Sequence, residues 1–470
     1  MNKTKIICTI GPSSENEETL TKMCLAGMNV ARLNFSHGTH EEHQKKIDLV
    51  RSVRDKLNLP IALMLDTKGP EYRIKTFENH HVSLQEGEEF VFTTEDCIGD
   101  EKHVAVNYPD LCSQLCPGDK SLVNNGLVVC RVTEIEDKNV HTVVEAGGVL
   151  SDRKSMNFPN KIMKGDFLSE QDKSDLLFGI QNGIDYVAAS FVSTKEDMVQ
   201  MRTFLNENGG NDIDVIAKIE NRAGVDNIDE ICEVADGIMV ARGDLGVEIP
   251  FMEVPSVQKY LISKCRMLGK RVITATEMLE SMIQNPRPTR AEVSDVANAV
   301  YDGTSALMLS GETAAGKYPV EAVRTMAQAA EFTEQHIDYA KRFQTQEFKI
   351  HSNLDAVSHA TCAMAIDVQA KCIVVCSMTG TTARMVSRFR CPTPIIGLTT
   401  SKRAWRKLNL SWGVLPILTE EFNSVEVMFY HAQKEAIRVM NLEKNDNVVI
   451  TGGLINGKTG NTNTIKVETV

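Results

Sequence analysis

The sequence of 470 residues lacks several features that would direct its interpretation elsewhere. It has no uninterrupted run of about 18 apolar residues, which a membrane-spanning helix would need. Its net charge is −12, so it lacks the positive surface that favours unspecific binding to nucleic acid or to an anionic membrane. The first residues contain no cleavage-like segment, so we expect no signal peptide. We therefore expect neither nucleic acid nor a membrane among its partners.

A complete zinc-binding pattern is also missing, although the sequence contains twelve cysteines. Cys112 and Cys116, and likewise Cys372 and Cys376, are separated by three residues, but no cluster of histidine or cysteine completes a site. Most other cysteines lie in apolar segments, where a free thiol packs as a small hydrophobic side chain. We therefore expect reduced thiols and a cytoplasmic location.

Eight short apolar runs alternate with amphipathic helical patterns. They cover residues 3–11, 29–36, 61–67, 185–191, 214–220, 237–243, 271–277 and 306–312. This alternation predicts a parallel α/β protein, and eight strands favour a closed (β/α)8 TIM barrel. An open doubly wound sheet is the alternative, but no GxGxxG motif follows the first run.

Two segments depart from the alternation. Residues 70–167 contain short, turn-separated strands, and they predict a small all-β domain of β-barrel type that is inserted after the third strand as a lid. The stretch FQTQEFKIHSN (343–353) is typical of a polar linker, and residues 350–470 predict a C-terminal α/β domain with about five strands. We therefore assign the barrel to residues 1–69 and 168–342.

Charged and hydroxyl side chains gather where six of the eight predicted strands end. Active sites of such barrels lie at the carboxyl ends of the strands. Lys218 and Glu220 are two residues apart on one strand, so they point to the same face. A structural salt bridge is the alternative explanation for this pair, but buried pairs rarely add stability. Six polar strand ends favour a functional site.

The residue types at these strand ends indicate phosphoryl transfer. Glu220 and Asp244 offer two hard oxygen ligands suited to Mg²⁺ or Mn²⁺. Neutral oxygens together with one carboxylate suit a monovalent cation, and they come from Asn34, Ser36, Asp66 and Thr67. Anion ligands are available from Arg32, Arg73 and Lys218, and from backbone N–H groups where GDLG begins a helix. Such a site works by positioning and charge neutralisation.

Eight stretches match the motifs of one family in their order: CTIGPSS, ARLNFSHG, LDTKGPE, AKIENRAG, MVARGDLGVEIP, ITATEMLESM, NPRPTRAEVSDVANAVYDGT and MLSGETAAGKYPVEAV. In these motifs the sequence resembles the pyruvate kinase family, along nearly its full length. It is similar to bacterial members without the extra C-terminal domain. The resemblance implies transfer of the phosphoryl group of phosphoenolpyruvate to ADP, giving pyruvate and ATP, with Mg²⁺ (or Mn²⁺) and K⁺ as cofactors.

The resemblance also implies roles for the matching residues. Lys218 would neutralise the migrating phosphoryl group, Arg32 would hold the phosphate, and Glu220 and Asp244 would bind Mg²⁺. The substrate carboxylate would be held by Gly243, Asp244 and Thr276, and protonation would run through water near Thr276 and Ser310. The implied K⁺ site comprises Asn34, Ser36, Asp66 and Thr67, and the implied nucleotide contacts comprise Asn34, His37, Arg73 and Lys154.

Several positions depart from the family pattern. Most lie in the predicted lid, and together they are Asn124, Asn125, Ser155, Gly165, Asp166 and, in the barrel, Glu277. They leave two alternatives to an active pyruvate kinase open: an impaired paralog that senses a phosphorylated metabolite, and an enzyme that uses another phosphoryl acceptor. Neutral drift of the lid is the simpler explanation. Glu71, in the position that a lysine occupies in members independent of K⁺, predicts K⁺ dependence.

The C-terminal segment carries a possible phosphate cradle, CSMTGTTAR (376–384). Hydroxyl donors precede a helix there, and they come from Ser377, Thr379, Thr381 and Thr382. In the family the corresponding loop binds a sugar-phosphate effector, and residues 452–464 resemble the flap that covers it. An ordinary strand-to-helix turn is the alternative. The resemblance further implies a homotetramer.

Overall fold

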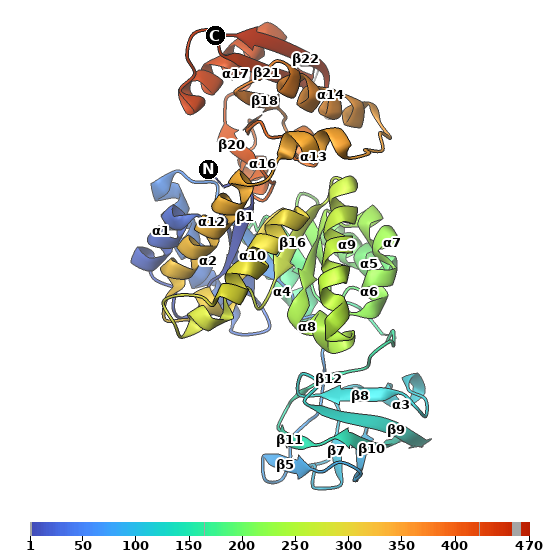
Figure 1. The fold of residues 1–470 in the computed structure, drawn as a ribbon. Coiled ribbons are helices and arrows are strands. Elements are labelled where there is room, and N and C mark those ends of the chain that lie inside the picture. Colours follow the sequence, from blue (N-terminus) through green and yellow to red (C-terminus); the bar gives the residue numbers. More distant parts are fainter. Residues whose placement is uncertain (1, 164, 423, 454–461) are drawn as a thin grey trace.

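The computed structural model of the protein describes residues 2–163, 165–422, 424–453 and 462–470 (Figure 1). Eight parallel strands form a closed barrel in the order β1-β17-β16-β15-β14-β13-β3-β2. Their bounds are β1 Lys5–Thr9, β2 Val30–Asn34, β3 Ala62–Asp66, β13 Tyr186–Ala189, β14 Asp214–Ile219, β15 Gly237–Ala241, β16 Arg271–Ala275 and β17 Ala306–Leu309. Each strand falls within one of the eight apolar runs, so the predicted barrel is confirmed.

The strands are apolar on both faces because both faces are buried. Ile7 belongs to the cluster that fills the barrel interior, whereas Ile6 and Cys8, its neighbours in β1, belong to the cluster beneath the helices. Successive side chains of a strand point to opposite faces, and here each face packs on a core. The sequence therefore shows unbroken apolar runs rather than alternation.

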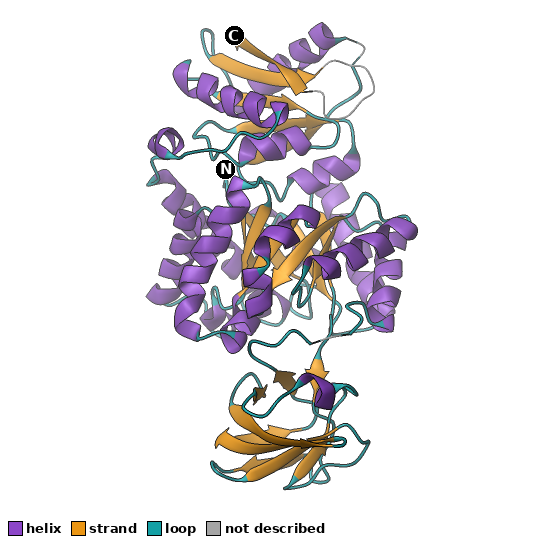
Figure 2. Ribbon diagram, turned by 90° about the vertical axis from the view of Figure 1, so that its right-hand side faces the viewer, coloured by secondary structure: helices purple, strands orange, loops and turns teal. Residues whose placement is uncertain are grey.

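Helices surround the barrel strands (Figure 2). Several begin at a side-chain cap. Thr39 and Glu42, for example, form a capping box at the start of α2. The helical segments of the barrel are α1 Glu17–Ala26, α2 His40–Leu57, α4 Glu170–Gln181, α5 Lys195–Glu207, α6 Arg222–Asp226, α7 Ile228–Val234, α8 Arg242–Glu248, η1 Phe251–Glu253, α9 Val254–Met267, η2 Glu280–Ile283, α10 Arg290–Asp302, α11 Gly311–Ala314 and α12 Pro319–Gln335. Among the described helices, none combines the length and the apolar character needed to cross a membrane.

The lid lies at one end of the barrel and the C-terminal segment at the other (Figure 1). The lid strands form a seven-stranded sheet, β4-β12-β8-β9-β10-β6-β7, and a two-stranded sheet, β11-β5. The expected all-β insert is confirmed, and its arrangement as a β-barrel stays a prediction. The lid elements are β4 Tyr72–Arg73, β5 His81–Leu84, β6 Glu89–Thr93, β7 His103–Ala105, α3 Leu111–Gln114, β8 Lys120–Val123, β9 Val128–Glu136, β10 Asn139–Ala146, β11 Gly148–Ser151 and β12 Ser155–Asn157.

The C-terminal segment contains the expected five-stranded sheet, in the order β20-β19-β18-β21-β22. Its elements are α14 Asn353–Asp367, β18 Cys372–Cys376, α15 Thr381–Ser387, β19 Ile395–Thr399, α16 Lys402–Leu408, β20 Val414–Leu418, α17 Val425–Met440, β21 Asn447–Gly453 and β22 Thr462–Thr469. The expected polar linker is partly wrong, because residues 339–345 form helix α13 (Tyr339–Thr345). Phe343 is buried and its ring contacts those of Phe348 and Phe389, so this segment packs onto the C-terminal core.

Helix α16 joins the C-terminal segment to the floor of the barrel. Arg406 donates from Nε to both carboxylate oxygens of Asp185, at 2.9 and 3.0 Å, and Asp185 is fully buried. Lys407 pairs with Asp214 at 2.5 Å. Burial raises the pKa of Asp185, and the charge of Arg406 opposes this rise. The barrel floor therefore contains a carboxylate that depends on a cation from the C-terminal segment.

We expect Arg406→Ala to destabilise the protein by about 3–5 kcal/mol, because it removes the cation that hydrogen-bonds the buried Asp185 carboxylate and leaves only the more distant charge of Arg54. The midpoint of thermal unfolding should fall by roughly 5 °C or more. Arg403→Ala is the matched control on the same helix, since Arg403 lies 3.5 Å from the exposed Asp212. Its effect should stay below about 1 kcal/mol. Equal shifts for both variants in differential scanning calorimetry would contradict this account.

Candidate active site

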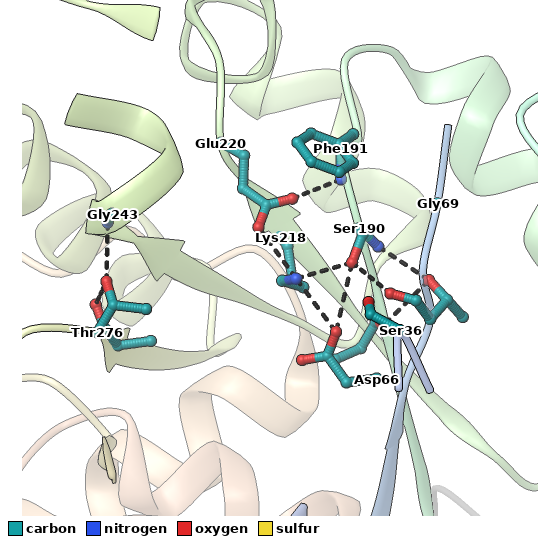
Figure 3. A network of polar contacts seen from close by, with 12 residues as sticks. Ser36, Asp66, Gly69, Ser190, Phe191, Lys218, Glu220, Gly243 and Thr276 are labelled. Atoms are coloured by element: carbon teal, nitrogen blue, oxygen red, sulfur yellow. Dashed lines mark hydrogen bonds and ion pairs between the residues drawn. The ribbon is translucent and has the colours of Figure 1, made fainter. Parts of the chain in front are cut away.

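Lys218 lies at the centre of a polar network at the carboxyl ends of the barrel strands (Figure 3). It projects from β14, and its Nζ donates to Ser190 Oγ at 2.7 Å and to Asp66 Oδ1 at 3.1 Å. The same Nζ lies 3.0 Å from Glu220 Oε1. Burial alone would lower the pKa of Lys218, but the carboxylates of Asp66 and Glu220 outweigh it and raise the pKa. A permanently charged ammonium is thus held in a buried position.

Asp66 joins Lys218 to Arg32. Its Oδ2 accepts a hydrogen bond of 2.6 Å from Arg32 Nε, and Arg32 Nη1 donates to Thr9 Oγ1 at 2.9 Å. Burial tends to raise the pKa of Asp66, but Arg32 and Lys218 outweigh it and lower the pKa. Asp66 is therefore ionised and holds both cations at one side of the barrel mouth. Two positive groups beside each other in a buried site are suited to bind a phosphoryl group.

The two carboxylate oxygens of Glu220, which lies directly after β14, have different partners. Its Oε2 accepts a hydrogen bond of 2.6 Å from the Phe191 N–H. Its Oε1 is buried, and its contact is the ion pair of 3.0 Å with Lys218 Nζ. Burial raises the pKa of Glu220 to about 7, the charge of Asp244 adds to the rise, and Lys218 opposes it.

The Oε1 of Glu220, which has no partner besides the Lys218 ammonium among the described residues, fits a divalent cation. A hard cation takes carboxylate oxygens, and its charge would favour the ionised form of the glutamate. Asp244, the second carboxylate, is exposed in the first turn of α8. Among the described residues, no three His, Cys, Asp or Glu side chains lie together as a metal cage. A cation at Glu220 and Asp244 would therefore take further ligands from substrate or water.

Sequence reasoning missed Ser190, which occupies a central place in the network. Its Oγ lies 2.7 Å from the carbonyl oxygen of Thr67 and 3.3 Å from Asp66 Oδ1, and it accepts from Lys218. A side chain at Gly69 would meet Ser190, because an added Cβ would lie 2.8 Å from the serine Cβ. The available signal was the position of Ser190 at the end of the fourth predicted strand, but an uncharged hydroxyl there is too common to single out.

The four residues of the implied K⁺ site lie at the ends of β2 and β3. Asn34 and Asp66 are partners in the register of these strands. The Asn34 Oδ1 accepts from the Ser36 N–H at 3.1 Å, and Thr67 Oγ1 accepts from the Ser190 N–H at 3.1 Å. The set offers mainly neutral oxygens and one carboxylate, which is chemistry that fits a monovalent cation.

Thr276 and Glu277 follow β16 with φ of +69° and +52°. A β-branched residue in this left-handed region is strained, and such strain persists only where the surroundings enforce it. Thr276 Oγ1 accepts from the Gly243 N–H at 2.8 Å and donates to the Ala275 carbonyl at 2.6 Å (Figure 3). The Gly243 N–H, expected to be free for a substrate carboxylate, is therefore bonded to Thr276 in this structure.

Ser310 lies apart from this network. It precedes α11, and its N–H donates to Glu312 Oε2 at 2.7 Å. In the part of the chain that the structure describes, no hydrogen bond links Ser310 to Lys218 or Thr276. Its expected role near the site of protonation stays a prediction.

A cavity of about 350 Å³ lies between the lid and the barrel. The predicted nucleotide ligands Arg73 and Lys154 line it together with Asp244. The other lining residues include five of the positions that depart from the family pattern, namely Asn124, Asn125, Ser155, Gly165 and Asp166. His37 is exposed, and neither it nor Asn34 is among the described residues that line this cavity. Arg73 pairs with Glu71 and donates to the Arg153 carbonyl at 2.5 Å.

The predicted effector loop connects β18 to α15. Ser377 Oγ accepts from the Gly380 N–H at 3.1 Å, and the hydroxyls of Thr379 and Thr381 lie 3.0 Å apart. Thr382 is buried, and its hydroxyl pairs with that of Thr462 on β22 at 2.6 Å. Most of the expected flap, residues 454–461, lies outside the described residues.

Comparison with known proteins connects this geometry to one family. The family model "Pyruvate kinase, barrel domain" matches residues 1–323, and the model "Pyruvate kinase, alpha/beta domain" matches residues 355–468. A pyruvate kinase of Clostridium acetobutylicum is 47% identical over 472 residues, covering 100% of both chains. One from Geobacillus stearothermophilus is 45% identical, covering 100% of this chain and 80% of the relative.

A solved structure supports the same family. The crystal structure of a pyruvate kinase from Cryptosporidium parvum matches with a TM-score of 0.95 and 37% identity, covering 100% of this chain and 96% of that one. Because both family models and full-length relatives match, the chain belongs to the pyruvate kinase family.

Proposed function

We propose that the protein transfers the phosphoryl group of phosphoenolpyruvate to ADP and releases pyruvate and ATP in glycolysis. The observation that supports this most is the position of Lys218, a buried cation between Asp66 and Glu220 with Arg32 beside Asp66. Relatives named pyruvate kinase that match the whole of this chain support the same reaction. The described residues do not favour an impaired paralog, because Arg32, Asp66, Lys218 and Glu220 lie together at the barrel mouth.

In this reaction each residue of the site would have the following role. Arg32 binds the phosphate, and Lys218 balances the charge of the phosphoryl group as it leaves one oxygen for another. Glu220 and Asp244 hold Mg²⁺ or Mn²⁺, which supplies Lewis-acid neutralisation of substrate oxygens when bound. Thr276, Gly243 and Asp244 orient the substrate carboxylate, and a water near Thr276 and Ser310 delivers the proton. Arg73 and Lys154 of the lid, with Asn34 and His37, bind ADP.

The direct test is formation of pyruvate from phosphoenolpyruvate and ADP in the presence of Mg²⁺. ADP, GDP and UDP should be compared, because the lid departs from the family pattern on the acceptor side. Turnover with ADP supports the proposal. Folded protein that releases pyruvate only with another acceptor would support the second alternative instead.

Members of the family generally use K⁺ as well as Mg²⁺, and we propose that this chain needs both. Glu71, which pairs with Arg73, is an acid and cannot replace K⁺ with an ammonium group. We expect turnover to fall by at least about tenfold when K⁺ is replaced by tetramethylammonium at equal ionic strength, since a charge that organises the phosphate site is lost. Unchanged turnover in the organic cation would contradict the K⁺ site at Asn34, Ser36, Asp66 and Thr67.

The remaining expectations belong to the same proposal. The domains are residues 1–69 with 168–342, residues 70–167 and residues 350–470. Family membership supports a cytoplasmic homotetramer. The loop with Ser377, Thr379, Thr381 and Thr382 is the place where a sugar phosphate would regulate the enzyme. A shift of the phosphoenolpyruvate saturation curve by a sugar phosphate, lost in Thr381→Ala, would support this site.

A further inference from the structure

A barrel carboxylate, that of Glu248, contacts the lid where the lid meets α8. Asn157, the last residue of β12, donates from Nδ2 to Glu248 Oε1 at 2.9 Å. The backbone of Phe158 hydrogen-bonds to the same carboxylate. Glu248 is the last residue of α8, the helix whose first turn contains Asp244. Figure 1 shows α8 at the end of the barrel that faces the lid. This carboxylate therefore joins the lid to the helix of the proposed metal ligand.

A second part of the lid lies against the same helix. The turn of Asn124, Asn125 and Gly126 has positive φ throughout, and a Cβ added at Gly126 would lie 3.6 Å from Val247 Cγ1. The Asn124 N–H donates to the Ser155 carbonyl at 3.0 Å, and Ser155 Oγ lies 3.1 Å from Asn125 Oδ1. The turn, β12 and α8 thus form one connected contact.

Contacts with the lid stabilise the ionised form of Glu248. The side chain is half-buried, and burial raises its pKa, with the charge of Asp244 adding to the rise. The hydrogen bonds from Asn157 and Phe158 lower the pKa and so stabilise the ionised form. Hydrogen bonds to an ionised acceptor are stronger than those between neutral groups. The ionised carboxylate therefore favours the position of the lid in which both donors reach it.

The two lid cations proposed to bind the nucleotide, Lys154 and Arg73, lie close to this contact. One is near it in the sequence, and the other is on the neighbouring strand. Lys154 lies three positions before Asn157. Arg73 in β4 pairs with Ser155 in β12. A displacement of β12 would move both cations away from the cavity that they line with Asp244 and Glu248. The position of Asn157 thus sets the position of both.

We propose that Glu248 is a positioning residue that anchors the lid beside Asp244 and thereby holds Arg73 and Lys154 over the nucleotide cavity. The inference rests on the proposed function, in which these two cations bind ADP. Glu248 itself touches no reacting atom. Its effect should therefore appear in the binding of ADP rather than in that of phosphoenolpyruvate.

The test compares Glu248→Ala, Asn157→Ala and the double variant by steady-state kinetics. We expect KM for ADP to rise about tenfold in each single variant, because charge-assisted hydrogen bonds are lost. KM for phosphoenolpyruvate should change by less than about twofold, and the double variant should resemble the single variants, since both remove one interaction. Glu134→Ala, on the exposed face of β9, is the control and should match the wild type.

Hydrogen exchange provides a readout that does not depend on turnover. The backbone amide of Phe158 should exchange faster in both single variants, whereas peptides of the barrel strands should not change. Asn157→Ala removes the same hydrogen bond from the lid side, so it provides the test if Glu248→Ala does not fold. An unchanged KM for ADP, or effects on KM that add fully in the double variant, would overturn the proposal that Glu248 anchors the lid. If the wild type formed no pyruvate, the proposed function would fail, while the exchange measurement would still decide the anchor.

Discussion

Lys218→Met should lower kcat by at least about 10³-fold, because it removes a buried positive charge from the place where phosphoryl charge develops. Nζ of Lys218 contacts Ser190, Asp66 and Glu220, so it is held in place before substrate arrives. A charge that needs no reorganisation during the reaction contributes more than one that has to move. Rapid-mixing measurement of pyruvate release gives kcat directly.

The fold of this variant should survive. Asp66 keeps its hydrogen bonds to Arg32 and Ser190, and Glu220 keeps the Phe191 N–H. The pKa of Glu220, already about 7, lets it become neutral when its cation is removed. Lys173→Met is the control, because Lys173 forms an exposed pair with Glu170 on α4. Near-normal turnover of Lys218→Met, with thermal unfolding like that of the wild type, would disprove the assignment.

Glu220→Gln should lower kcat/KM for phosphoenolpyruvate by about 10²–10³-fold, because it removes one of two carboxylates proposed to hold the divalent cation. Glutamine retains an oxygen that can accept from the Phe191 N–H, so the local structure should be kept. It lacks the negative charge that a hard cation prefers. The concentration of Mg²⁺ required for half-maximal activity should rise at the same time.

Binding of Mn²⁺ to the protein without substrate, followed by electron paramagnetic resonance, separates metal binding from catalysis. It should weaken by about tenfold or more in Glu220→Gln, since a charged ligand is lost. Glu233→Gln is the control, because Glu233 pairs with Lys195 on the outer helices. If the two variants bound Mn²⁺ equally well, Glu220 would not be a metal ligand.

The fold could be predicted from the sequence because the apolar runs and helical patterns recur at regular intervals. Each barrel strand is buried on both faces, so each appears as a short apolar run. The alternation of these runs with helices predicts a parallel α/β protein, and their number, eight, favours a barrel. The order in which the lid strands pair could not be predicted. Alternating apolar residues predict strands, but their pairing depends on a register that no local pattern contains. Phe343 was misassigned to a linker for a similar reason, since its partner Phe389 is distant in sequence.

The sequence predicted those residues of the candidate site whose types are unusual at the end of a buried strand. Charged side chains at strand ends stood out, and the structure brings Arg32, Asp66, Lys218 and Glu220 together. Ser190 did not stand out, since serine is common at the end of a strand. The Asn157 to Glu248 contact also remained hidden, because it joins residues 91 positions apart in two different units. Pairwise contacts of ordinary polar residues require coordinates.

The pairing of β1 with β17 determines when the barrel can close during synthesis. Lys5 pairs with Ala306, so the first strand has no final neighbour on one side until about 300 further residues have been made. At about 5–20 residues per second, the ribosome needs roughly 15–60 s to provide that neighbour. During this interval the apolar β1 is exposed to wrong partners. Residues 70–167, a continuous segment with its own core, can fold while the rest of the barrel waits. The interrupted barrel is therefore the part of the nascent chain that most needs protection by chaperones.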